Sequence, residues 1–119
     1  IYTNPEIAWT GYTESELKNK KIKYNKAIFP WQASGRAMTN NSVDGKTKIL
    51  STKDNSKILG VGIVGHNAGE IISEATLAIE MGASIEDIAL TIHPHPTLSE
   101  TFSNSAEMLL KTITDLYIK

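Results

Sequence analysis

The chain contains no cysteine among its 119 residues. Disulfides, thiolate metal sites and thiol nucleophiles are therefore excluded within it. A protein without disulfides suits a reducing compartment, and we expect a cytoplasmic location. Proline is also scarce, with four residues in all, yet Pro94 and Pro96 lie together in one short segment. That clustering makes the segment the first candidate for a functional site.

Neither sign of charge dominates, since 12 basic residues stand against 13 acidic ones and the net charge is −1. A general polyanion-binding surface is therefore excluded, and we expect no nucleic-acid partner. No apolar run approaches the ~20 residues that a membrane span needs, so we expect no membrane association. The first residues contain neither methionine nor the pattern of a signal peptide. We expect the chain to begin inside a longer gene product.

Apolar residues make up 40% of the chain and charged residues 21%, which indicates one folded domain with a modest core. The nearly all-apolar segment 58–64 predicts a central strand covered on both faces. The element order is one strand, one helix, three strands and then helices. This order predicts the α+β class, an antiparallel β-sheet with helices packed on one side. The patterns predict strands over 22–29 (ended by Pro30), 47–52 and 58–64. They predict helices over 13–20 with a capping box at Thr13, over 67–82 with a cap at Asn67, over 84–90 with a cap at Ser84, and after residue 97. We expect an apolar stripe on the second of these helices at Ile71, Ile72, Ala75, Ala78 and Ile79, and one on the last at Leu98, Phe102, Ala106, Leu109, Leu110 and Ile113.

Two segments resist a simple assignment. Residues 30–45 show no clean period and are rich in Gly, Asn and Ser, so we expect a long ordered loop. Arg36, the only arginine, lies in that loop, and we expect it to anchor the loop by bonding backbone carbonyls.

Gly60, Gly62 and Gly65 superficially suggest a nucleotide-binding fingerprint. The first two glycines lie inside the predicted strand, so close packing is the better interpretation.

The segment His93-Pro94-His95-Pro96 holds two of the three histidines of the chain. Histidine exchanges protons near neutral pH, and proline stiffens the backbone, so the segment suits a held acid or base. His93 and His95 could instead ligate a metal together with His66 or an acid. No known ligand spacing matches that set, and we expect no metal site. Structural turn histidines are a further alternative.

Glu100 follows five residues after His95 and has two possible roles. It could orient the imidazole of His95, as a carboxylate does in a catalytic triad. It is also the last residue of a capping box that starts at Thr97, and spacing alone favours this second role. The two roles are compatible, because a cap fixes where the helix starts and hence where His95 points.

The His-x-His-Pro-Thr-x-x-Glu pattern at residues 93–100 resembles the C-terminal signature of the dihydrolipoamide dehydrogenase family of flavin disulfide reductases. Asn4 stands where that family usually has Asp, a departure that leaves the assignment intact. The resemblance covers essentially the whole chain. Its other segments are Tyr2–Ala8, Gly11–Glu14, Phe29–Ala37, Ile58–Gly60, His66–Glu70, Glu80–Gly82 and Glu86–Ala89.

The resemblance implies that residues 1–119 are the C-terminal dimerisation (interface) domain. FAD and NAD would serve the full-length enzyme, whereas this fragment alone would bind neither and would be inactive. His95 would be the base and Glu100 its carboxylate partner in oxidation of protein-bound dihydrolipoamide, reaching the active site of the other subunit. The resemblance further implies a cis His95–Pro96 bond.

The partners implied are a second copy of the chain and the lipoyl-bearing and subunit-binding domains of 2-oxo acid dehydrogenase complexes. Two alternatives to this function stay open. The chain could be a purely structural homodimerisation and complex-docking module, in which His95 and Glu100 only shape the turn. It could also be the same domain of a related disulfide reductase.

Overall fold

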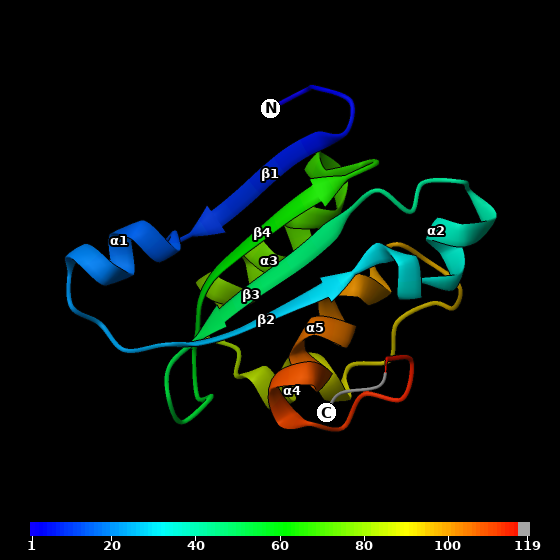
Figure 1. Ribbon diagram of the computed structural model, residues 1–119. Coiled ribbons are helices and arrows are strands. Elements are labelled where there is room, and N and C mark those ends of the chain that lie inside the picture. The colour runs from blue at the N-terminus through cyan, green and yellow to red at the C-terminus, as the bar shows by residue number, and fades with distance from the viewer. Residues whose placement is uncertain (117–119) are drawn as a thin grey trace.

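A computed structural model describes residues 1–116 of the chain (Figure 1). Four antiparallel strands form one sheet in the order β1-β4-β3-β2. Helices α3, α4 and α5 all lie on one face of it, so the predicted α+β class is confirmed. The elements are β1 (Glu6–Gly11), α1 (Glu14–Asn19), β2 (Asn25–Pro30), the 3-10 helix η1 (Trp31–Ala33), α2 (Gly35–Thr39), β3 (Lys46–Ser51), β4 (Ile58–Gly65), α3 (Ala68–Glu80), α4 (Ile85–Leu90) and α5 (Glu100–Leu110).

Local signals placed several of these elements correctly. Thr13 caps α1 in a full capping box, and Ser84 caps α4 in the same way with Asp87 as the third residue. The strand predicted from residue 22 begins only at Asn25. The Ile22 N–H instead donates to the Leu17 carbonyl and so belongs to the turn that ends α1. These two caps formed as their local sequence predicts, whereas the cap expected at Asn67 did not form.

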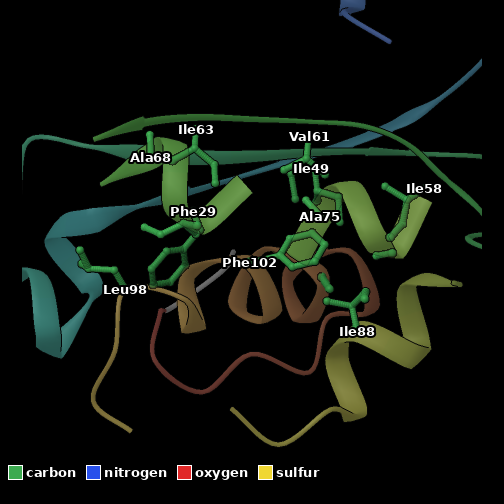
Figure 2. Packing of buried hydrophobic residues seen from close by; sticks show 14 of the residues in the cluster. Phe29, Ile49, Ile58, Val61, Ile63, Ala68, Ala75, Ile88, Leu98 and Phe102 are labelled. Atoms are coloured by element: carbon green, nitrogen blue, oxygen red, sulfur yellow. The ribbon is translucent and has the colours of Figure 1, made fainter. Parts of the chain in front are cut away.

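The hydrophobic core lies between the sheet and helices α3, α4 and α5 (Figure 2). Phe102 of α5 lies in the middle of this layer and is 1% exposed. The predicted stripe on α5 is confirmed where Leu98, Phe102 and Ala106 are buried. Thr101 and Ser105 on the same helix are buried too, because their hydroxyls donate to the carbonyls of Leu98 and Phe102. The helix is therefore enclosed around most of its circumference.

The prediction that residues 58–64 are covered on both faces is wrong. β4 is indeed central, between β1 and β3, but the helices cover one face only. On the opposite face Ile7, Trp9, Ile28 and Val64 are each at least a third exposed. The apolar segment 58–64 therefore has only one of its two faces covered by other parts of this chain.

The expected long loop at residues 30–45 is also wrong in part, since η1 and α2 lie within it. Ser34 caps α2, its hydroxyl accepting the Ala37 N–H at 3.2 Å. Arg36 is exposed, and its side chain makes no hydrogen bond among residues 1–116, so the expected loop anchor is not found. The segment is instead anchored by buried Trp31, whose indole N–H donates to the Thr47 hydroxyl at 3.0 Å.

The interpretation of the strand glycines as close-packing positions is confirmed at Gly60 but wrong at Gly62, where a Cβ atom would meet no atom within 4 Å. A Cβ atom on Gly60 would collide with the backbone carbonyl of Tyr12, which crosses this point of β4. Gly45 and Gly65 also allow close approach, because a Cβ atom on either would overlap the Trp31 ring. None of the helices in residues 1–116 is both long and apolar enough to cross a membrane.

Glu14 joins α1 to the open face of the sheet. Its carboxylate accepts hydrogen bonds from Lys48 at 2.9 Å and Tyr24 at 2.9 Å, and Lys26 lies 3.2 Å away. The Lys48 hydrogen bond is the largest cause lowering the pKa of Glu14 to about 2, and burial opposes it. A carboxyl group with a lowered pKa stabilises the fold above its ordinary pKa, and that stability is lost as the pH falls through the lowered value.

We expect Glu14→Gln to lower the free energy of unfolding at pH 7 by about 1–2 kcal/mol, after allowance for solvent screening of the lysines. Urea titrations at several pH values would measure it. The difference between the two proteins should shrink as the pH falls from about 4.5 to about 2. A difference independent of pH would show that the charge of Glu14 is not the cause.

Candidate functional site

The loop between α4 and α5 carries the candidate site. It begins after Leu90, where the Thr91 hydroxyl donates to the Asp87 carbonyl at 2.6 Å and closes α4. It ends at Glu100, the first residue of α5. The peptide bond between His95 and Pro96 is cis, as predicted. The loop thus presents its histidines between two fixed helix ends.

His95 and Glu100 lie together at the end of this loop. The Nδ1 atom of His95 is 3.1 and 3.0 Å from the two carboxylate oxygens of Glu100. An ionised carboxylate only accepts, so Nδ1 carries the hydrogen and Nε2 of the neutral ring keeps its lone pair. The His95 side chain is 78% exposed and that of Glu100 is 19% exposed. The geometry presents a free basic nitrogen to an incoming group.

Glu100 makes both contacts that its spacing suggested, one with His95 and one at the start of the helix. Its Oε1 atom accepts the Thr97 N–H at 2.8 Å, which is half of a capping box. The other half is absent, because the Thr97 hydroxyl donates to the Pro94 carbonyl at 2.7 Å. The residue before the helix, Ser99, makes no side-chain cap. The carboxylate therefore fixes the helix start while it faces His95.

An open groove of about 230 Å³ borders the pair, with Met38 of α2 and Asn104 of α5 on its walls. The hydrogen bond and charge of Glu100 raise the pKa of His95, and the charge of Asp115 adds to the effect. Burial, together with Asp115 and Glu100, raises the pKa of Glu107 nearby. The negative surroundings favour the protonated ring, so they increase the basicity of Nε2.

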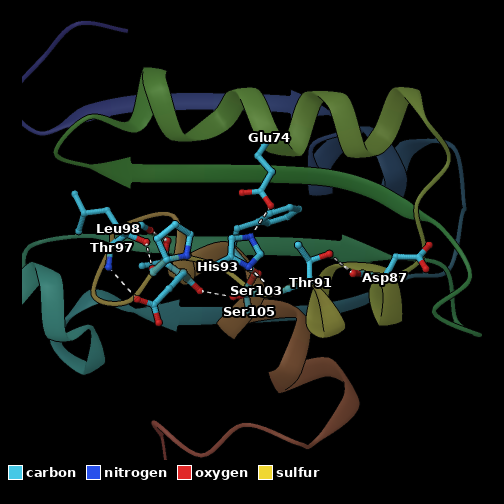
Figure 3. Close-up of polar contacts among 12 residues, drawn as sticks. Glu74, Asp87, Thr91, His93, Thr97, Leu98, Ser103 and Ser105 are labelled. Carbon is cyan, nitrogen blue, oxygen red and sulfur yellow. Dashed lines mark hydrogen bonds and ion pairs between the residues drawn. The ribbon is translucent and has the colours of Figure 1, made fainter.

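His93 occupies a different environment from His95. Its Nε2 atom is 2.5 Å from Glu74 of α3, and its Nδ1 atom is 2.9 Å from the Thr91 carbonyl (Figure 3). The His93 side chain is only 7% exposed. The two histidines therefore make separate contacts, and residues 1–116 contain no group of three potential metal-ligating side chains. The alternative of a shared metal has no support in this geometry.

The pairing of His93 with Glu74 was not predicted. A weak signal exists, because Glu74 stands between the buried residues Ile71 and Ala75 on the apolar side of α3. An acid beside such a stripe needs a partner. The sequence could not say which partner, since 19 residues separate the two.

The start of α3 does not fit a dinucleotide. The predicted Asn67 cap is wrong, because Asn67 has a left-handed backbone and its side chain makes no cap bond. The carboxylate of Glu6 instead accepts the Gly69 N–H at 3.0 Å, so an acidic side chain occupies this helix N-terminus. A phosphate group would meet that carboxylate and be repelled. This helix start therefore does not offer a free anion-binding N-terminus.

Comparison with known proteins identifies the family. Residues 1–106 match the family described as pyridine nucleotide-disulphide oxidoreductase, dimerisation domain. The chain belongs to this family, which the antiparallel sheet and its layer of helices also fit. It is similar to the dihydrolipoyl dehydrogenase of Buchnera aphidicola subsp. Acyrthosiphon pisum, with 59% identity over 115 residues. The dihydrolipoyl dehydrogenase of Vibrio cholerae is 53% identical over the same length.

These matches cover 97% of this chain and 24% of each relative. The chain thus spans about a quarter of the length of the relatives. Among solved structures, LpdA of Mycobacterium tuberculosis superposes with a TM-score of 0.85 at 24% identity, covering 91% of this chain and 24% of that one. The HOCl-induced flavoprotein disulfide reductase RclA of Escherichia coli superposes with a TM-score of 0.84 at 20% identity. That match covers 89% of this chain and 24% of the RclA chain. These likenesses support the fold.

Proposed function

We propose that residues 1–119 are the C-terminal dimerisation domain of a dihydrolipoamide-oxidising enzyme and supply its acid/base pair. The observation that carries the proposal is the exposed Nε2 atom of His95, whose ring is oriented through Nδ1 by Glu100. A ring held in this tautomer can accept a proton at an exposed position. The similarity to dihydrolipoyl dehydrogenases supports dihydrolipoamide as the substrate.

In this mechanism Nε2 of His95 takes a proton from a dihydrolipoamide thiol. The resulting thiolate attacks a disulfide that the rest of the enzyme provides, which forms a mixed disulfide while the other enzyme sulfur leaves as a thiolate. The second thiol of dihydrolipoamide then displaces the remaining enzyme sulfur, which closes the lipoamide disulfide and leaves the enzyme with two reduced sulfurs. Glu100 stabilises the imidazolium that forms. In the intact enzyme, FAD and NAD held by the rest of the protein would supply the oxidation that restores the enzyme disulfide. The chain itself contains no cysteine, so it would supply no redox disulfide and would be inactive alone. We also propose that it binds neither cofactor by itself, because its sequence lacks the glycine-rich turn between a strand and a helix that cradles a dinucleotide.

A dimerisation domain implies a homodimer, and we propose that the pair reaches the active site of the other subunit. The further partners proposed are the lipoyl-bearing and subunit-binding domains of 2-oxo acid dehydrogenase complexes, in the cytoplasm. The deciding test is turnover of dihydrolipoamide by the full-length protein with His95→Gln. Turnover should fall, whereas transfer from NADH to an artificial acceptor should survive because it bypasses the thiol step.

A second candidate is a purely structural dimerisation and docking module. The contact between Glu100 and the Thr97 N–H favours it, because a cap explains that carboxylate without any chemistry. This candidate expects His95→Gln to leave turnover unchanged wherever the dimer is intact. A related disulfide reductase is the third candidate, and it expects turnover with a different disulfide substrate.

We expect the isolated chain to self-associate. The sequence suggested that the stripes of α3 and α5 would supply the apolar surface, but those residues pack largely against the sheet. Two exposed apolar regions could instead form the contact. One is the open sheet face, where Trp9 is 55% exposed, and the other is the C-terminal part of α3, where Leu77 is 62% and Met81 76% exposed. Sedimentation at tens of micromolar should show dimers. A compact monomer alone would mean that dimerisation needs the rest of the protein.

A further inference from the structure

We infer that Glu74 and His93 form a positioning pair that fixes the placement of the proposed base, His95. The inference rests on the proposed function of His95. Glu74 belongs to α3 and His93 to the loop before α5, so their contact joins two elements that are far apart in sequence (Figure 3). Neither residue touches the groove beside His95.

The His95 ring has few restraints of its own. Its side chain is 78% exposed, and Glu100 is its only hydrogen-bond partner among residues 1–116. Within residues 1–116 the ring is not packed against other side chains, so Glu100 and the backbone that carries His95 determine its position. The backbone is therefore the element whose displacement would move the base.

That backbone is fixed on its N-terminal side by His93. The His93 ring is 7% exposed and is held at both nitrogens, by Glu74 at 2.5 Å and by the Thr91 carbonyl at 2.9 Å. The Thr91 carbonyl can only accept, so Nδ1 of His93 donates to it, and Nε2 shares a hydrogen with the Glu74 carboxyl group. A buried ring with a hydrogen bond at each nitrogen holds the backbone at His93 in place.

The restraint passes to His95 through a stiff segment. Pro94 and Pro96 flank His95 and fix their own φ angles. The Thr97 hydroxyl also donates to the Pro94 carbonyl at 2.7 Å, which ties the turn to the start of α5. A shift of His93 therefore moves His95 instead of being absorbed by rotation in between. Misplacement of a catalytic group by about 1 Å can cost up to ~10²-fold in rate.

The test uses the full-length protein that contains this chain, with dihydrolipoamide as substrate. Glu74→Ala should lower kcat by about tenfold with little change in KM, while NADH transfer to an artificial acceptor stays normal. Glu74→Gln keeps an acceptor oxygen for His93 and should retain most of kcat. Glu80→Ala is the matched control, since it removes an exposed glutamate of the same helix.

His93→Phe provides a second route, because it keeps a ring in the space but removes both nitrogens, and it should reproduce the loss of kcat. Combining Glu74→Ala with His95→Gln should add no further loss, because Glu74 acts through His95.

Acylation of His93 by diethyl pyrocarbonate, followed by mass spectrometry, should be slow in the wild type. It should be several-fold faster in Glu74→Ala but not in Glu74→Gln.

The results separate the two proposals. If His95→Gln keeps turnover, the proposed function fails. If His95→Gln loses turnover but Glu74→Ala and His93→Phe keep the wild-type kcat, only the positioning pair is overturned. A further loss in the double variant would also overturn it, since Glu74 would then act by another route.

Discussion

His95→Gln in the full-length protein is expected to lower dihydrolipoamide turnover by about 10²–10⁴-fold. This is the range that a general base contributes to a rate. Gln cannot accept and return a proton, although it is similar in polarity and size. The loss should be in kcat, and transfer from NADH to an artificial acceptor should be unaffected. Steady-state kinetics of both reactions on one preparation would measure it.

Glu100→Gln is the informative companion and should cost much less, on the order of tenfold. The amide oxygen of Gln can still accept the Thr97 N–H, so the start of α5 should barely change. The charge that raises the pKa of His95 disappears, so that pKa should fall. His95 then stays unprotonated to lower pH, and the acidic limb of the pH–rate profile should move to lower pH. Equal loss of both activities in either variant would indicate a disrupted dimer, as the structural alternative expects.

Trp31→Ala is expected to lower the free energy of unfolding of the chain by about 3–5 kcal/mol, a large part of the stability of a typical domain. The Trp31 ring is fully buried, and its N–H donates to Thr47. Removal of the ring leaves a cavity between Gly45 and Gly65, whose Cα atoms closely approach it. The Thr47 hydroxyl keeps a second contact with Thr101 at 2.8 Å, so it is not left unpaired. Urea unfolding at low temperature would measure the change.

Trp9→Ala is the matched control. The same substitution in β1 removes a ring that is 55% exposed on the open sheet face, so at protein concentrations below those of self-association it should cost no more than about 1 kcal/mol. Trp31→Phe separates the indole N–H from the ring and should give an intermediate loss. Equal destabilisation by Trp31→Ala and Trp9→Ala would contradict the assignment of Trp31 to the core.

The sequence by itself determined the features that depend on contacts within a few residues. The capping box at Thr13 and the cap at Ser84 placed the starts of α1 and α4, because these bonds close within one turn, although the similar cap expected at Asn67 did not form. The spacing of Leu98, Phe102 and Ala106 predicted the buried side of α5. Glu100 could be assigned to the neighbourhood of His95 for the same reason, since only five residues separate them.

Tertiary structure alone decided which distant residues meet. The contact of Glu74 with His93 depends on α3 crossing the sheet beside the loop before α5. The contact between the Glu6 carboxylate and the Gly69 N–H at the start of α3 joins residues 63 positions apart in the sequence. It forms because β1 pairs with β4, which places Glu6 beside the end of β4. The uncovered face of β4 likewise follows from which side the helices pack. Hydrophobic burial is non-directional, so an apolar pattern specifies that a residue is buried but not against which neighbour. Those neighbours are set by the order of strands in the sheet and by the face that the helices cover.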